Sequence, residues 1–145
     1  MFRAAEQAFA ELKPVIEGAG LEPRARSWIG ILDEEPQGPD DESARLLIGA
    51  IFDYSLSDRG GLCTRPACPV TGTLAWHQLP AGRYAVFTHL GPYRRLHLTW
   101  IAIYRDWLPA TGYALRDAPP FEHYLADPLT TAPEKLRADI YIPLQ

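Results

Sequence analysis

The chain has 145 residues, of which 47% are hydrophobic and 22% are charged, and its formal net charge is −4. This balance is typical of a globular domain, and the acidic excess argues against general nucleic-acid binding, which needs a basic surface to neutralise phosphates. We expect no membrane partner, because the longest apolar run of a predicted strand, residues 46–52, is far shorter than the ~20 residues of a membrane helix. No signal-peptide pattern opens the chain, so the expected location is the cytoplasm.

The predicted elements mix helices and strands, which gives an α+β fold class. Apolar residues at helical spacing predict a helix over 3–18, and strands are expected over 26–33 and 45–54. A segment rich in Gly, Pro and Ser, residues 55–72, is typical of a linker. After it we expect two short strands, a long helix and two further strands, at 73–78, 82–89, 93–108, 119–125 and 136–144.

The two halves of the chain align without a gap at an offset of 92 residues. The identity is low, but the matching pairs fall at the helix end, the turn and the strand start. We therefore interpret the chain as two pseudo-symmetric strand–helix–strand–strand modules with antiparallel sheets, an internal repeat within a single domain, 1–145. The modules cover about 2–54 and 73–145. The pairs include Gly20 with Gly112, Pro36 with Pro128, and Arg45 with Arg137.

The first module lacks its opening strand in this interpretation, since the equivalent segment would lie before Met1. The edge of that module is then open, and unpaired strand edges favour pairing with another chain. A homodimer through this edge is therefore one expected assembly.

Strand alternation predicts a shared second face of the two modules, opposite the face that packs on the helices. In the last strand Tyr141 lies on that face, and in the strand before it Glu122 and Tyr124 do so, while Phe121 and Leu125 look inward. The repeat adds residues of the first half, and Gly30 and Gly49 leave space in the middle of the wall. The predicted face comprises Trp28, Gly30, Leu32, Leu47, Gly49, Ile51, Glu122, Tyr124 and Tyr141.

An apolar aromatic cleft with one carboxylate suits an amphipathic, aromatic and in particular cationic organic molecule. Glu122 would be its charge partner, although the pattern alone fits an exposed strand carboxylate equally well. Trp100 and Tyr104 belong to a helix stripe that is more typical of a core. They are still candidate ligand contacts, because one end of such a helix can border a groove.

Four segments resemble the GyrI-like small-molecule-binding domain, which is also the effector-binding domain of AraC-type and BmrR-type transcription regulators. They are GRYAVFTHLGPY (82–93), WIAIYRDWLPATGY (100–113), FEHYLADP (121–128) and PEKLRADIYIPL (133–144). The resemblance is specific over 80–144 and weaker over 2–54. It implies two modules with a ligand cleft between them. It also implies that the acid of the FE-x-Y segment, Glu122, pairs with cationic ligands and that Tyr124 is the second aromatic of that segment.

The resemblance leaves three functions open. The first is a stand-alone module that binds a small molecule for drug or ligand capture. The second is a hydrolase of electrophilic cyclopropane-type genotoxins, in which Glu122, Tyr124 and Tyr141 would be catalytic. The third is a protein-interaction module such as a gyrase inhibitor. No helix-turn-helix accompanies the domain, so gene regulation by this chain alone is not expected.

Metal and cofactor sites are not expected. Cys63 and Cys68 stand in a Gly- and Pro-rich segment without a second pair, which is a poor zinc pattern. The histidines show no ligand spacing, and no phosphate-binding loop or nucleophile motif is present.

Overall fold

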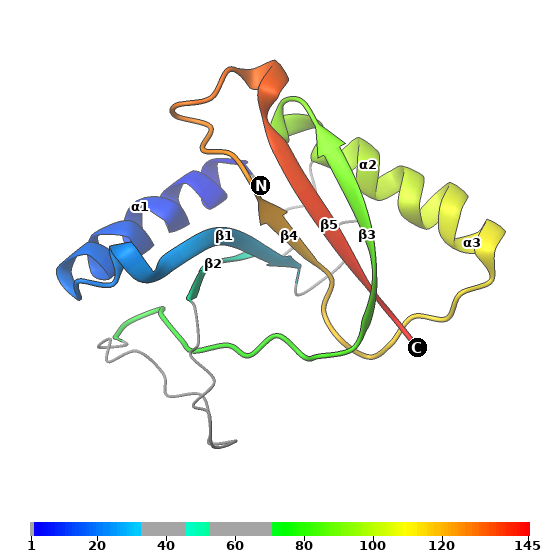
Figure 1. Cartoon of the computed structure of the whole chain (residues 1–145), viewed down its shortest axis with the longest axis horizontal. Helices are drawn as coiled ribbons and strands as arrows, with labels where there is room; N and C mark the ends of the chain where they lie inside the picture. Colours follow the sequence, from blue (N-terminus) through cyan, green and yellow to red (C-terminus); the bar gives the residue numbers. More distant parts are fainter. Residues whose placement is uncertain (1, 33–45, 53–70) are drawn as a thin grey trace.

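A computed structural model describes residues 2–32, 46–52 and 71–145 of the chain (Figure 1). The helical segments are α1 Phe2–Gly18, η1 Glu22–Arg24, η2 Tyr93–Arg95, α2 Leu96–Ala102, the π-helical turn η3 Ile103–Trp107, α3 Leu108–Thr111 and η4 Pro133–Lys135. The strands are β1 Ala25–Leu32, β2 Leu46–Phe52, β3 Arg83–Leu90, β4 Phe121–Tyr124 and β5 Arg137–Leu144.

The strands in the described part of the chain form one open five-stranded sheet in the order β2-β1-β4-β5-β3. Each neighbouring pair is antiparallel. The α+β class is therefore confirmed. Figure 1 shows α1 beside β1 and β2, and the α2–α3 helix beside β3 and β5, with the short strand β4 between the two groups.

Both helical layers cover the same face of the sheet. Ala50, Trp28, Tyr124 and Ala138 are successive cross-strand neighbours and so share one face. At one end of this row, Trp28 and Ala50 pack against α1 in a cluster around Ile16. At the other end, Ala138 belongs to the main core, together with the α2–α3 helix. We call this face the helix face; its centre is β4, where the two helical layers meet.

The opposite face of the sheet, called here the second face, is apolar at its centre as well. Ile29, Ile31 and Phe121 are buried there, and Tyr84 and Tyr141 pack against them. The ring of Tyr141 stacks on Phe121 with centroids 4.5 Å apart. The central strands are therefore lined by large apolar side chains on both sides.

Two predicted elements differ from the structure. Residues 73–78 form a turn and an irregular segment rather than a strand. The long helix does not end at Pro109, which lies in α3 directly after the π-helical turn η3. The helix continues instead to Gly112, whose φ of 67° is the left-handed conformation that commonly ends helices.

The outer edge of β2 pairs with no strand in the described part of the chain. No helix of that part is long and apolar enough to cross a membrane. The predicted linker 55–72 lies almost entirely outside the described residues, as do Cys63 and Cys68.

Candidate functional site

Glu122 lies at the centre of the helix face, on β4, with only 6% of its surface exposed. The indole N–H of Trp100 donates a hydrogen bond to its Oε1 at 2.6 Å. The hydroxyl of Tyr124 lies 2.5 Å from its Oε2 and donates to it. The carboxyl group is therefore held from both sides by side chains that carry no charge.

The backbone places these three side chains together. Glu122 and Tyr124 are two residues apart on β4, so both point to the helix face, toward α2, which carries Trp100. Gly30 lies directly opposite Glu122 on the neighbouring strand. A Cβ added at Gly30 would lie 2.7 Å from the Tyr124 hydroxyl oxygen. The glycine therefore leaves the room into which this hydroxyl fits.

Burial dominates the electrostatics of the site. It raises the pKa of Glu122 above 4.5, and the hydrogen bonds from Tyr124 and Trp100 oppose this rise only in part. Burial, followed by the neighbouring Glu122 carboxylate, raises the pKa of Tyr124 as well. The Tyr124 phenol therefore keeps its proton at physiological pH.

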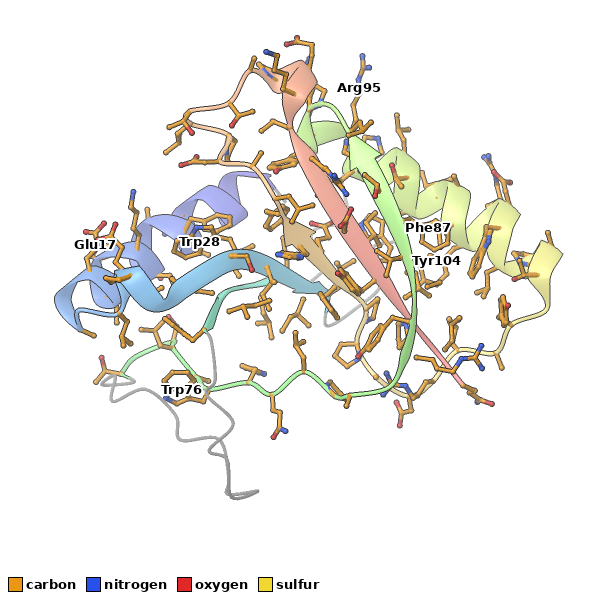
Figure 2. All side chains as sticks on the ribbon, viewed as in Figure 1. Glu17, Trp28, Trp76, Phe87, Arg95 and Tyr104 are labelled. Atoms are coloured by element: carbon orange, nitrogen blue, oxygen red, sulfur yellow. The ribbon has the colours of Figure 1, made fainter. Side chains whose placement is uncertain are left out.

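Further aromatic rings surround the carboxyl group. Tyr104 stacks on Trp100 with ring centroids 6.0 Å apart. The ring of Tyr93 lies 5.2 Å from that of Tyr124, centroid to centroid. Phe9 of α1 makes edge contacts with Tyr124 at 6.0 Å and with Trp28 at 5.5 Å. Figure 2 shows Trp28 near α1 and Tyr104 near the α2–α3 helix, on either side of the central strands.

A surface depression of about 420 Å³ adjoins this group of rings. The depression lies beyond the Trp28–Tyr124 pair, where β1 and β4 no longer pair, while the Leu125 N–H continues the bonding to β5 at the Arg137 carbonyl oxygen. Tyr124 borders both the depression and the Glu122 carboxyl group. The depression, called here the β1–β4 depression, is lined by Ala25, Ser27, Trp28, His123, Tyr124, Leu125, Ala126 and Asp127.

The prediction that all candidate residues share one face is wrong. Trp28, Gly30, Leu32, Glu122 and Tyr124 lie on the helix face, which Trp100 and Tyr104 cover. The others point to the second face, with Phe121, because their cross-strand partners lie there. These residues are Leu47, Gly49, Ile51 and Tyr141.

The predicted space over the two glycines differs from the structure too. The Tyr124 hydroxyl occupies the space beside Gly30. At Gly49, on the second face, an added Cβ would meet Ile29 at 3.5 Å, an ordinary contact. The aromatic residues around Glu122 are therefore packed against one another, and the open volume lies to one side, in the β1–β4 depression.

Two residues of the site escaped the sequence analysis. Tyr93 was quoted only as part of the GPY segment, yet its hydroxyl lies 2.7 Å from the Ala126 carbonyl oxygen and 2.8 Å from that of Arg137. This anchor holds the ring against Tyr124. Phe9 is one of the apolar residues at helical spacing in the predicted helix 3–18, and this spacing does not distinguish a core contact from a site contact.

No group of three or more His, Cys, Asp or Glu side chains in the described residues could hold a metal ion. The chemistry of the site is that of one buried carboxyl group, one phenol, one indole N–H and several ring faces.

Comparison with known proteins assigns the chain to a family. Residues 2–145 match the family described as GyrI-like small molecule binding domain, so the chain belongs to this family. The probable transcriptional regulator YgiV of Escherichia coli K12 is 42% identical over 69 residues, which cover 46% of this chain and 42% of that protein. The DNA gyrase inhibitor of Erwinia billingiae is 29% identical over 105 residues, which cover 69% of this chain and 59% of the inhibitor. The matches thus span about half the length of these relatives.

Proposed function

We propose that the chain captures an amphipathic, aromatic, cationic organic molecule beside Glu122. The observation that carries this proposal is a buried carboxyl group among aromatic rings that has no basic partner in the described residues. A buried acid without a cation is costly for a fold, because two uncharged donors do not replace the hydration that a carboxylate loses. A positively charged ligand would supply the missing partner, and the surrounding rings favour a flat cation.

The β1–β4 depression supports the proposal, because its volume of about 420 Å³ is within the range of small-molecule sites. Trp28 and Tyr124 offer rings on its wall, and Asp127 adds a second carboxylate. The aromatic part of the ligand would occupy this depression, and its charge would approach Glu122 past Tyr124. On the other side of the carboxyl group, Trp100 would keep its hydrogen bond to Oε1, and Tyr104 would stack on the Trp100 ring.

The two-module organisation is part of the same proposal. In the first half Gly30 pairs with Ile48, and in the second half Glu122 pairs with Ile140, at the same offset of 92 residues. Gly30 also pairs with Glu122 itself, so a pseudo-two-fold axis would pass between them. The first module would lack the counterpart of β3, which leaves the outer edge of β2 for a second copy of the chain.

The test is a titration with a cationic aromatic dye, followed by tryptophan fluorescence. We expect Glu122→Gln to weaken binding at least tenfold, because the amide keeps the shape of the side chain but cannot carry the charge. Glu134→Gln is the matched control, since Glu134 is exposed. Equal affinity of the parent and Glu122→Gln would exclude the role proposed for this residue.

A hydrolase is the second candidate, and the contact between Tyr124 and Glu122 favours it. A carboxyl group with a raised pKa beside a phenol could donate or accept a proton during opening of a cyclopropane ring. Tyr141 would have no part in it, because it lies on the second face. Turnover of an electrophilic cyclopropane substrate that is lost in Glu122→Gln would support the hydrolase; binding without turnover would contradict it.

Inhibition of gyrase is a third candidate, because one relative is named a DNA gyrase inhibitor. A supercoiling assay tests it, and full supercoiling at saturating protein would exclude it.

A further inference from the structure

We infer that the Glu122 carboxyl group is neutral in the empty site and that the captured cation replaces its proton. Binding is then a one-for-one exchange of a cation for a proton. This inference rests on the proposed function, which it deepens.

The surroundings of Glu122 carry the inference, because the described residues around it offer hydrogen bonds but no positive charge. On its own face the carboxyl group meets Trp100 from α2 and Tyr124 from β4. Its cross-strand neighbours are Gly30 of β1 and Ile140 of β5, which carry no charge. In the described part of α1, Phe9 is the residue that contacts Tyr124.

None of the other titratable groups that the structure describes nearby forms an ion pair with the carboxyl group. Tyr93 lies against Tyr124 as a neutral phenol with a pKa raised by burial. The Asp127 carboxylate acts on Tyr93 and is itself an acid. His89, on the helix face, is hydrogen-bonded to Thr99. His123 and Asp139 are cross-strand neighbours on the second face, on the other side of the sheet from the carboxyl group.

The hydrogen-bond geometry assigns the proton to one oxygen. The Nε1 atom of Trp100 can only donate, so Oε1 of Glu122 must act as an acceptor in either state. In the neutral acid the proton would therefore sit on Oε2, 2.5 Å from the Tyr124 hydroxyl oxygen, which would then accept instead of donating as it does to the carboxylate. A phenol can accept as well as donate, so this contact survives both states.

Neutral Glu122 and a free cation become a carboxylate–cation pair and one proton, which leaves to the buffer. Tyr124 then turns its O–H toward Oε2 and stabilises the carboxylate. A neutral molecule of the same shape would not stabilise the carboxylate, so Glu122 would keep its proton when that molecule binds.

Calorimetry with N-methylquinolinium tests the exchange, because this flat cation cannot titrate. Methylnaphthalene, its neutral isostere, is the ligand control. Titrations in two buffers of different ionisation enthalpy, from about pH 5 to pH 9, count the protons released. We expect close to one proton per bound cation on the acid side of the Glu122 titration, with affinity rising about tenfold per pH unit there and levelling off above it. Binding of the isostere should release none.

Infrared difference spectra give a second readout that needs no variant. Binding of N-methylquinolinium should remove one carboxylic acid C=O band and add carboxylate bands. Glu122→Gln should show neither change, whereas the surface variant Glu134→Gln should show both.

The outcomes separate the two proposals. If N-methylquinolinium binds, Glu122→Gln weakens binding at least tenfold, and affinity is flat across the pH range without proton release, the exchange is wrong and the proposed function stands. If N-methylquinolinium does not bind, or binds equally well to Glu122→Gln, the proposed function fails and the exchange with it.

Discussion

At the scale of single residues, the site depends on a carboxyl group that contacts no cation in the described part of the chain and on a glycine that makes room for its phenol donor. Glu122 could be selected from the sequence because the FE-x-Y segment carries the family resemblance. Its environment could not be derived. The alternation of side chains along a strand shows which side faces the core only where the other side is polar and exposed. Both sides of β4 are buried, with Phe121 on one side and Glu122 on the other.

The raised pKa of Glu122 predicts how stability depends on pH. A raised pKa means that the folded chain binds this proton more tightly than the unfolded chain, for which 4.5 is the reference. The stabilising contribution is therefore complete below pH 4.5 and is lost as the pH rises through the folded-state value. We expect the unfolding free energy of the parent to fall relative to Glu122→Gln by up to about 1.4 kcal/mol per pH unit in that interval. Urea unfolding at a series of pH values measures it; a constant difference across the series would contradict the raised pKa.

Gly30 offers a separate steric prediction. Gly30→Ala places a Cβ 2.7 Å from the Tyr124 oxygen, so the phenol must move away from Glu122. We expect a loss of about 1–3 kcal/mol, the usual cost of overpacking. Gly49→Ala, where the nearest contact is 3.5 Å, is the control and should change stability by less than about 1 kcal/mol. Thermal unfolding compares the two, and equal effects would show that the Tyr124 contact is not tight.

At the scale of elements, the α2–α3 helix determines which side of Glu122 is closed. Periodicity predicted this helix and its buried stripe, but it could not show that Trp100 serves both the core and the carboxyl group. The hydrogen bond depends on the register of β4 against β5, which is a long-range property. The prediction of a strand at 73–78 fails for a related reason, since short alternating runs form strands only where a partner strand is available.

The indole of Trp100 can be tested against a second tryptophan of the same helix. Trp100→Phe keeps a buried ring but removes the N–H donor to Oε1 of Glu122, and we expect a loss of about 1–3 kcal/mol together with weaker cation binding. Trp107 packs against Phe87 and Tyr113 instead. Trp107→Phe should lower stability without a specific effect on cation affinity. The same loss of affinity in both variants would argue for a general packing effect.

At the scale of the whole molecule, the sheet places the two helical layers on one face and leaves the outer edge of β2 unpaired within the described residues. The sequence predicted the strands that became β1, β2, β4 and β5, and the two-module interpretation of them stays a proposal. It could not give the β1–β4 depression, which depends on where two strands stop pairing.

The proposed self-association through β2 can be tested with Leu47→Lys. Leu47 is 37% exposed on this edge strand, so we expect a change in stability of less than about 1 kcal/mol. An added lysine charge on an edge strand opposes strand pairing between copies. Sedimentation equilibrium should show a dimer for the parent and a weaker one for the variant. A monomeric parent at high concentration would exclude the assembly.

The glycine opposite Glu122 has a consequence for any design that makes the two halves alike. If a glutamate replaced Gly30 as well, two acids would face each other across the middle of the sheet, and such neighbours retain a shared proton because both cannot ionise at close range. The pair would then present less than two full negative charges to a ligand, and the second glutamate would fill the space that the Tyr124 hydroxyl occupies beside Gly30. A single acid facing a glycine avoids this sharing, and under the proposed function it would leave one full negative charge for one cation.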